Sequence, residues 1–302
     1  MTYRCLKKTT PLLFADERAL ISFGKDEHEV VDSLNNDLSE IQEWLICNKL
    51  TLNSGKTKFL LFGRRKTDHD FHVMINEKKI EQVFSAKFLG LLINEKLSWK
   101  EHMVHLLSKI QRNLGIVYKI KHYLNKTSLL QLYYSMIFSH VKYGISIWHH
   151  GNLTMQKKVQ VVMNKFIRII FSMGYRDSVR EIMAENDILS LNQLFFKEIA
   201  MIQQKLENNC LPKHFDNLYE GLKRTTTMVT RSHAKYNPSF CKAIYTRQNI
   251  THTGPKIWNS IPKGVKFDEN DDICSLSSVK SFKNKIHTFC IENVSFYANN
   301  ES

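Results

Sequence analysis

Residues Leu12–Ile21 read LLFADERALI, and this stretch places two carboxylates between two short apolar runs. Apolar runs flanking a short polar turn predict a β-hairpin. Carboxylate oxygens at the tip of a hairpin are ligands that a divalent metal ion prefers. Asp16 and Glu17 are therefore candidate catalytic residues, with Asp16 as the candidate metal ligand. The alternative is that both are only polar turn residues.

Around this hairpin, residues 1–97 predict a small unit of mixed secondary structure. Asp26 with Glu29 three positions later is a helix-capping pattern, and apolar residues at helical spacing continue as far as Leu45. Alternating or apolar runs predict strands at 19–23, 57–62, 71–75 and 84–93. A helix packed on a small antiparallel sheet is the expected arrangement.

The rest of the chain divides into a helical part and an irregular part. Residues 98–210 have helical periodicity almost throughout, including one long helix over 127–148, and predict a helical bundle. Ser98, Ser178 and Ser190 are each followed three residues later by Glu or Gln, which predicts three capping boxes. Residues 211–302 carry four of the five prolines and one clear helical pattern, over 279–289. The predicted fold class is α+β, mostly α.

The positive charge is concentrated in the helical part. The net charge is +14, and between Lys100 and Arg180 thirteen Lys and Arg residues face only Glu101 and Asp177, which leaves +11. A helical region this basic is expected of a surface that contacts nucleic-acid phosphates. The alternative is a solvated helical face with no such role. The candidate phosphate contacts are Lys109, Arg112, Lys119, Lys121, Lys126, Lys142, Lys157, Lys158, Lys165 and Arg168.

Cysteine spacing and hydropathy indicate where the chain resides. The six cysteines form no C-x-x-C pair and no zinc-like cluster, which is typical of free thiols in a reducing compartment. Asp16 and Glu17 interrupt the only apolar run near the N-terminus, and no run is long enough for a membrane span. We expect an intracellular protein of the nucleus or cytoplasm, not secreted and not in a membrane, with no small-molecule cofactor.

Histidines and aromatic residues of the helical part have two readings each. His102, His105, His149 and His150 lack the partners of a metal site, so we expect exposed or capped helix histidines. Six aromatics lie among the basic residues, where they can stack on bases, although helical spacing favours the core for most. These aromatics are Tyr118, Tyr123, Tyr133, Tyr134, Tyr143 and Trp148.

An ordered series of motifs resembles the reverse transcriptases of jockey-like non-LTR retrotransposons. Residues 14–21 resemble the family's F/Y-A-D-D-T-A-L core, and residues 44–59 resemble its W-x-x-x-N-K-L-x-L-N-x-x-K-T-K segment. Phe88-Leu89-Gly90 resembles the family's F/Y-L-G primer grip, followed by an L-S-W-x-x-H pattern at 97–102. Residues 254–262, GPKIWNSIP, complete the series. The resemblance extends over almost the whole chain in the family's order.

The resemblance implies an RNA-directed DNA polymerase fold and activity. Residues 1–97 correspond to the late palm with primer-grip strands, 98–210 to a helical thumb, and 211–302 to a loosely structured extension. The family uses two Mg²⁺ or Mn²⁺ ions to join nucleotides. Asp16 corresponds to a metal ligand, Glu17 replaces the usual second aspartate, and Lys56 corresponds to a lysine near the leaving pyrophosphate.

The family's fingers and its other metal-binding aspartate come before the hairpin, and only fifteen residues precede Asp16 here. We therefore expect a truncated reverse transcriptase that is inactive alone, binds no metal stably, and contacts an RNA or RNA/DNA primer-template duplex without sequence preference. A polymerase half that needs a separate upstream fragment is one alternative. A helical protein-interaction module and a relic without function are the others.

Overall fold

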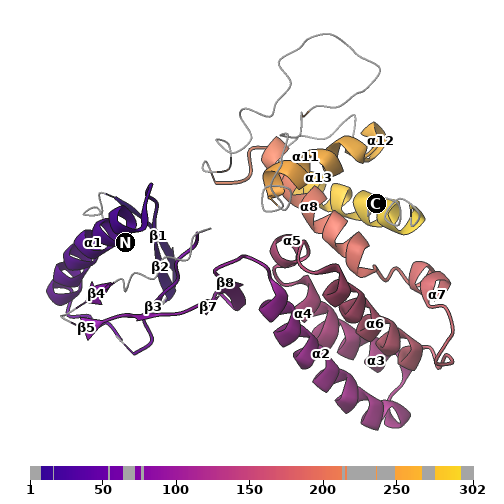
Figure 1. Cartoon of the computed structure of the whole chain (residues 1–302). Helices are drawn as coiled ribbons and strands as arrows, with labels where there is room; N and C mark the ends of the chain where they lie inside the picture. Colours follow the sequence, from indigo (N-terminus) through magenta and orange to yellow (C-terminus); the bar gives the residue numbers. More distant parts are fainter. Residues whose placement is uncertain are drawn as a thin grey trace. The chain divides into compact units, whose positions relative to one another are not determined.

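The computed structural model describes residues 8–15, 17–53, 55–63, 72–75, 78–212, 215, 236, 249–266 and 276–293. The chain divides into two compact units, residues 1–102 and 103–302. Small β-ladders lie in the first unit and helices dominate the second, which confirms the predicted α+β, mostly α class (Figure 1). Among the described helices, none combines the length and the hydropathy that crossing a membrane requires.

The first unit begins with a β-hairpin and a long helix. Strands β1 (Thr9–Phe14) and β2 (Glu17–Ser22) pair antiparallel, with Phe14 opposite Glu17. Helix α1 (Glu27–Cys47) follows, and the side chain of its N-cap residue Asp26 accepts a hydrogen bond from Glu29 N at 2.8 Å. The hairpin and the N-cap predicted from the sequence are therefore both present.

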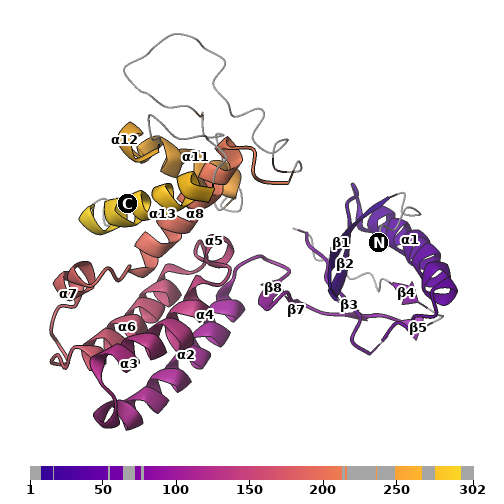
Figure 2. The ribbon, with the colours of Figure 1, turned by 180° about the vertical axis from the view of Figure 1, so that it is seen from behind.

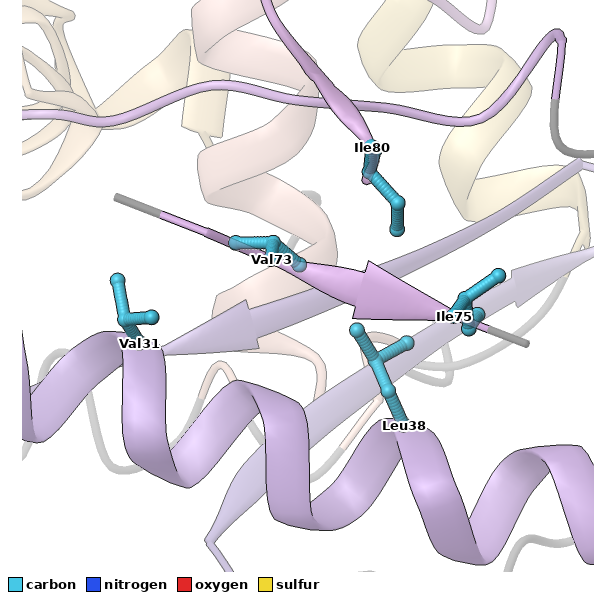
Figure 3. Close-up of a cluster of buried hydrophobic side chains, with 5 residues drawn as sticks. All are labelled: Val31, Leu38, Val73, Ile75 and Ile80. Atoms are coloured by element: carbon cyan, nitrogen blue, oxygen red, sulfur yellow. The ribbon is translucent and has the colours of Figure 1, made fainter. Parts of the chain in front are cut away.

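The core of this unit lies between α1 and the strands that follow it. Figure 3 shows Val31 and Leu38 on one side of α1, pointing toward Val73, Ile75 and Ile80. The two α1 residues are two helical turns apart, so they share one face. Val73 and Ile75 alternate along one strand, so they also share a face. Partly buried apolar side chains, including Leu20 of β2, complete the cluster and hold the hairpin against α1.

The described strands of this unit form separate two-stranded ladders. Strands β4 (Met74–Ile75) and β5 (Lys78–Lys79) are antiparallel, as are β7 (Ser85–Phe88) and β8 (Leu91–Asn94), whereas β3 (Lys58–Phe59) runs parallel to β6 (Glu81–Gln82). The sequence predicted longer strands. Helix α1 contacts β1, β2 and β4, so the hairpin and the β4–β5 ladder pack on the same helix.

The second unit is built from a helical bundle. Its first helices are α2 (Lys100–Ile120), η1 (Lys121–Tyr123), α3 (Lys126–Tyr133), the π-helical η2 (Tyr134–Phe138), α4 (Ser139–Lys142), α5 (Ile145–Trp148) and α6 (Leu153–Ile170). In both views α2, α3, α4 and α6 lie side by side (Figures 1 and 2). The core includes the fully buried Tyr133 and Phe166, whose ring centroids are 5.5 Å apart.

The helix predicted over 127–148 is broken into four pieces. Gly144 has φ 65°, a left-handed conformation that glycine adopts readily and that ends a right-handed helix. The carbonyl of Tyr143, at the break, accepts a hydrogen bond from Trp148 Nε1 at 2.9 Å. The residues on both sides of the break are helical, as their periodicity predicts. One glycine in a helical pattern is not enough to predict a turn.

The last helices pack around one central helix. These are α7 (Arg180–Glu185), α8 (Leu191–Glu207), α11 (Ile250–Ser260), α12 (Lys263–Lys266) and α13 (Leu276–Glu292). Both α11 and α13 contact α8. The sequence predicted α13 but missed α11, because Gly254 and Pro255 lie inside that helix and normally indicate a break.

Of the three predicted capping boxes, one is present. Ser190 caps α8 and Gln193 completes the box. Ser98 instead exchanges hydrogen bonds with Asn94, since its Oγ accepts from Asn94 Nδ2 and its N–H donates to Asn94 Oδ1. The prediction for Ser178 is wrong, because α7 begins after Val179 with no side-chain cap.

Candidate nucleic-acid interface

The tip of the β1–β2 hairpin meets the turn between β7 and β8. Leu89 N–H donates a hydrogen bond to Glu17 Oε2 at 2.7 Å, across 72 residues of sequence. The structure therefore brings together two of the predicted sites, the carboxylate hairpin and the primer-grip motif. Asp16, the predicted metal ligand, lies outside the described residues.

The β7–β8 turn has an uncommon backbone conformation. Phe88 pairs with Leu91, so Leu89 and Gly90 form a two-residue loop. Leu89 has φ 46° and Gly90 has φ 79°. Positive φ at both central residues defines a type I′ hairpin turn, which normally carries Asn-Gly or Gly-Gly. A leucine in the left-handed region is strained, and such strain concentrates at functional sites.

The described residues do not assemble the metal site that the family implies. One oxygen of Glu17 is engaged by Leu89 N–H, and among the described residues no group of three or more His, Cys, Asp or Glu side chains could hold a metal ion. Lys56 lies exposed on a turn in which its own N–H donates to Asn53 O at 3.0 Å.

The basic residues of α2 occupy one face of the helix. Lys109, Arg112 and Lys119 are exposed and are spaced so that they lie on the same side. The opposite side carries the buried Met103, Ile110 and other apolar residues. The charge of α2 is therefore turned to solvent as a continuous stripe.

Helix α6 repeats this arrangement. Lys157, Lys158, Lys165 and Arg168 follow one side of the helix, and buried residues such as Val159 and Phe166 follow the other. Lys157 and Lys158 are exposed, whereas Lys165 and Arg168 are half-buried. We call these two sets the basic stripes: Lys109, Arg112 and Lys119 of α2, and Lys157, Lys158, Lys165 and Arg168 of α6.

Four predicted contact residues are engaged within the protein, among them Arg168, whose Nε donates to the backbone O of Asp177 at 3.0 Å. Lys142 forms an ion pair with Glu198 at 3.2 Å. Lys126 Nζ lies 4.2 Å from the ring centroid of Phe171, and Lys121 Nζ lies 4.3 Å from that of Tyr118. The sequence could not show these contacts, because each partner belongs to another element or turn. The side chains outside such contacts are the stronger candidates for phosphate contact.

The aromatic residues divide between core and surface. Tyr133 and Trp148 are fully buried, as helical spacing predicts. Tyr118 is 61% exposed and Tyr123 is 87% exposed, beside Lys119 and Lys121 at the end of α2 and in η1. Exposed tyrosines next to lysines are the combination that stacks on bases while contacting phosphates.

Two of the predicted exposed histidines are buried. His102 Nδ1 accepts a hydrogen bond from Leu92 N at 3.4 Å, and His149 stacks on Phe195 with ring centroids 4.1 Å apart. Burial lowers the pKa of His149 to about 4 and that of His150 to about 4. Both are therefore neutral near pH 7, and the expectation of exposed helix histidines was wrong for His102 and His149.

The sequence analysis singled out Arg168 but not Arg176 and Arg180. All three line a cavity of about 320 Å³, to which α6, α7 and the segment between them contribute. Arg176 lies between α6 and α7, and Arg180 is the first residue of α7. Neither belongs to a repeated helical pattern, so periodicity does not identify them. Their place just after the basic stripe of α6 was the only indication in the sequence.

Comparison with known proteins found relatives among transposon proteins. The chain is 26% identical over 161 residues to "Probable RNA-directed DNA polymerase from transposon X-element" of Drosophila melanogaster, which covers 52% of this chain and 18% of that protein. It is 23% identical over 172 residues to "RNA-directed DNA polymerase from mobile element jockey" of Drosophila funebris, covering 56% of this chain and 19% of the relative. The jockey protein of Drosophila melanogaster is 21% identical over 172 residues.

The chain thus spans less than a fifth of the length of these curated relatives. No protein family model matches the chain. No solved structure matches it either. Over about half of its length, the chain is a relative of the RNA-directed DNA polymerases of jockey and X-element transposons, which confirms the resemblance to reverse transcriptases of non-LTR retrotransposons.

Proposed function

We propose that this chain is the part of a retrotransposon reverse transcriptase that holds an RNA or RNA/DNA primer-template duplex without reading its sequence. The observation that carries the proposal is the sign of the charge on α2 and α6, because their solvent-facing sides carry Lys and Arg and Glu101 is the one acid in the two helices. Phosphate contact needs positive charge at the right reach and no particular base.

The sign of the charge also bears on the alternative of a protein-interaction module. Charges opposite a buried face are expected of any amphipathic surface helix, whereas a face that only solvates the bundle would mix both signs. The solvent-facing sides of α2 and α6 carry basic residues, with Glu101 as the one acid in the two helices, and the exposed Tyr118 and Tyr123 lie beside the end of α2. In this proposal α2 to α6 act as the thumb, and Phe88, Leu89 and Gly90 contact the primer strand.

The role proposed for Glu17 follows from its contact. Its carboxylate accepts from the backbone of Leu89, which fixes the primer-grip turn against the hairpin tip. We assign Glu17 a positioning role, holding the turn, and leave metal binding out of its function. The proposed activity of the chain alone is duplex binding without primer extension.

Fluorescence anisotropy with a labelled RNA/DNA hybrid tests the proposal. We expect similar affinity for two hybrids of unrelated sequence, and an affinity that falls steeply as salt is raised from about 50 to 200 mM. An affinity that does not change with salt would contradict the electrostatic role. Incorporation of nucleotides into the hybrid by the purified chain would contradict binding without extension.

A second candidate is a polymerase portion completed by an upstream palm and fingers supplied as a separate chain. The β1–β2 hairpin favours it, because Leu12, Leu13 and Phe14 of β1 are 41%, 43% and 65% exposed. A strand with this much exposed apolar surface is suited to packing against another protein segment. Co-expression with the upstream half of a jockey-like relative should then restore metal-dependent primer extension, and a Phe14→Ser variant should weaken the restoration.

A further inference from the structure

A cavity that is partly open to solvent lies at the C-terminal end of α6. Its wall is formed by Asn164 and Arg168 of α6, by Arg176 and Arg180 and their neighbours, and by Ile291 of α13. The pocket measures about 320 Å³, at the small end of the range of ligand cavities in proteins. A phosphate ion would fill only part of it.

The polar part of the lining is strongly basic. It contains three arginines, Arg168, Arg176 and Arg180, and one acid, Asp177. Asp177 Oδ2 accepts a hydrogen bond from Gly174 N at 2.6 Å, so this carboxylate is used in folding the loop. Arg168 Nε donates to the backbone O of Asp177 at 3.0 Å, which fixes one guanidinium at the pocket wall.

Arg176 and Arg180 have no ion-pair partner among the described residues. Both are exposed, and among the described residues no ion pair or hydrogen bond involves the side chain of either. Gln160 Nε2 donates to Asn164 Oδ1 at 2.7 Å, which leaves the amide N–H groups of Asn164 as further donors. The pocket therefore offers donors to an anion, and guanidinium groups suit phosphate because they donate two parallel hydrogen bonds.

The lining of the pocket also contains apolar side chains, which we call the apolar wall. Val179, Met183 and Ile188 are buried side chains of this lining, and Ala184 is half-buried there. A lining that combines basic and apolar side chains matches a nucleotide, whose base is flat and mostly apolar on its faces and whose phosphate is anionic. The size of the pocket fits one such unit better than a bare phosphate.

We propose that this pocket binds a nucleotide 5′-monophosphate, either free or at the end of a nucleic-acid strand. The phosphate lies against Arg176 and Arg180, with Arg168 held behind them by Asp177, and the base lies against the apolar wall. The inference goes beyond the proposed duplex binding, and it shares only Arg168 with the basic stripes. The two can therefore fail separately.

Isothermal titration calorimetry of the full chain with deoxyadenosine 5′-monophosphate tests the site. We expect saturable binding of the monophosphate, weaker binding of inorganic phosphate, and no binding of deoxyadenosine. The double variant Arg176→Gln/Arg180→Gln should lose about tenfold or more in affinity for the monophosphate, since hydrogen bonds to charged groups are lost. The matched charge control, Lys25→Gln/Lys78→Gln on the other unit, should change affinity by about twofold at most.

A pocket-filling variant tests the apolar wall. Ala184→Leu should weaken binding of the monophosphate and leave binding of inorganic phosphate unchanged, and circular dichroism should show that the helix content of each variant is retained. Two pentanucleotides, with and without a 5′-phosphate, distinguish the sources. Tighter binding of the phosphorylated strand identifies a strand end, and equal binding of the two identifies a free nucleotide.

Absence of saturable monophosphate binding would overturn the proposal. Equal losses in the arginine pair and the lysine control would also overturn it, because net charge alone would then explain the binding. Loss of duplex binding with monophosphate binding retained would contradict only the proposed function of the basic stripes.

Discussion

Glu17 shows how one side chain connects two distant motifs. The resembled motif has aspartate at this position, and the additional methylene lets the Glu17 carboxylate reach outward from the hairpin. There it accepts from Leu89 N–H at 2.7 Å. A carboxylate acceptor and a backbone donor form a charge-assisted bond, which is shorter and stronger than a neutral one. The Glu17 side chain therefore connects the hairpin tip with the backbone of the β7–β8 turn.

Removing this acceptor should loosen the primer-grip turn. Glu17→Ala is expected to lower protection of the Leu89 amide against hydrogen exchange about tenfold, corresponding to about 1.4 kcal/mol for the bond. Glu17→Gln keeps an acceptor oxygen and should retain most of the protection. Exchange monitored by NMR decides the point, and unchanged protection in Glu17→Ala would show that the contact is not maintained in solution.

His149 makes the stability of the helical unit depend on pH. Burial lowers its pKa to about 4, below the ordinary value of 6.5. Between these values the unfolded chain binds more protons than the folded one, so stability is present above pH 6.5 and is lost as the pH falls toward 4. From pH 6.5 to pH 5 the loss due to His149 should be about 2 kcal/mol.

Urea unfolding at pH 7 and pH 5 measures this loss. His149→Phe preserves a ring beside Phe195 and removes the titrating group, so the difference between the two pH values should become smaller. Burial also lowers the pKa of His150, so part of the pH dependence of stability will remain in this variant. A variant with the same pH dependence as the original chain would assign the effect to other groups.

At the scale of elements, the turn of the β7–β8 hairpin is strained because a leucine occupies a left-handed position where asparagine would be favoured. Leu89 at φ 46° precedes Gly90 at φ 79°, where Asn-Gly is the favoured pair. Leu89→Asn should stabilise the first unit by about 1 kcal/mol, because the left-handed conformation costs leucine about 1–2 kcal/mol. Urea unfolding measures the change in the free energy of unfolding, and hydrogen exchange shows whether the gain lies in this hairpin.

The same variant tests the function of the turn. If Leu89 contacts the primer strand, Leu89→Asn should weaken hybrid binding although it stabilises the fold, as expected where strain serves a site. Lys87→Gln on the neighbouring strand provides a charge comparison. Stabilisation without any loss of binding would show that the leucine is not part of the interface.

Element by element, the sequence predicted what local patterns encode. The Asp26 cap, the α1 apolar face and the Ser190–Gln193 capping box depend on residues within four positions of one another, and all three are present. The break at Gly144 and helix α11 were missed because packing decides both. In α11, Trp258 is buried, and its contacts with the rest of the unit outweigh the penalty of Pro255.

The candidate site was predictable to a similar extent. Phe88-Leu89-Gly90 could be identified as a motif, whereas its contact with Glu17 spans 72 residues and has no signature in local sequence. Helical spacing predicted that the basic residues and the buried residues lie on opposite faces of α2 and of α6. It did not predict the engagement of Lys142 by Glu198, since that depends on how α4 and α8 pack.

At the scale of the molecule, the net charge of +14 should be visible in the salt dependence of binding. Each phosphate that a lysine neutralises adds about 0.9 to the slope of log affinity against log salt for a duplex. The variant Lys157→Gln/Lys158→Gln/Lys165→Gln should therefore reduce the magnitude of this slope by about 2 to 3 units.

The matched control removes three exposed lysines outside the stripes, Lys25, Lys78 and Lys205. It lowers the net charge equally and should change the slope by less than about one unit. Anisotropy titrations at four salt concentrations give both slopes. Equal slopes for the two triple variants would show that overall charge, and not the α6 stripe, drives binding.

The packing of α13 against α8 buries a cysteine whose reactivity can report when α13 moves away. Cys290 of α13 is fully buried, and its carbonyl accepts from Gln193 Nε2 at 2.6 Å, whereas Cys47 and Cys210 are exposed. A thiol-reactive dye should therefore modify Cys47 and Cys210 at once and Cys290 only when α13 detaches from α8. Because Ile291 beside it lines the arginine pocket, a nucleotide bound there should slow the labelling of Cys290.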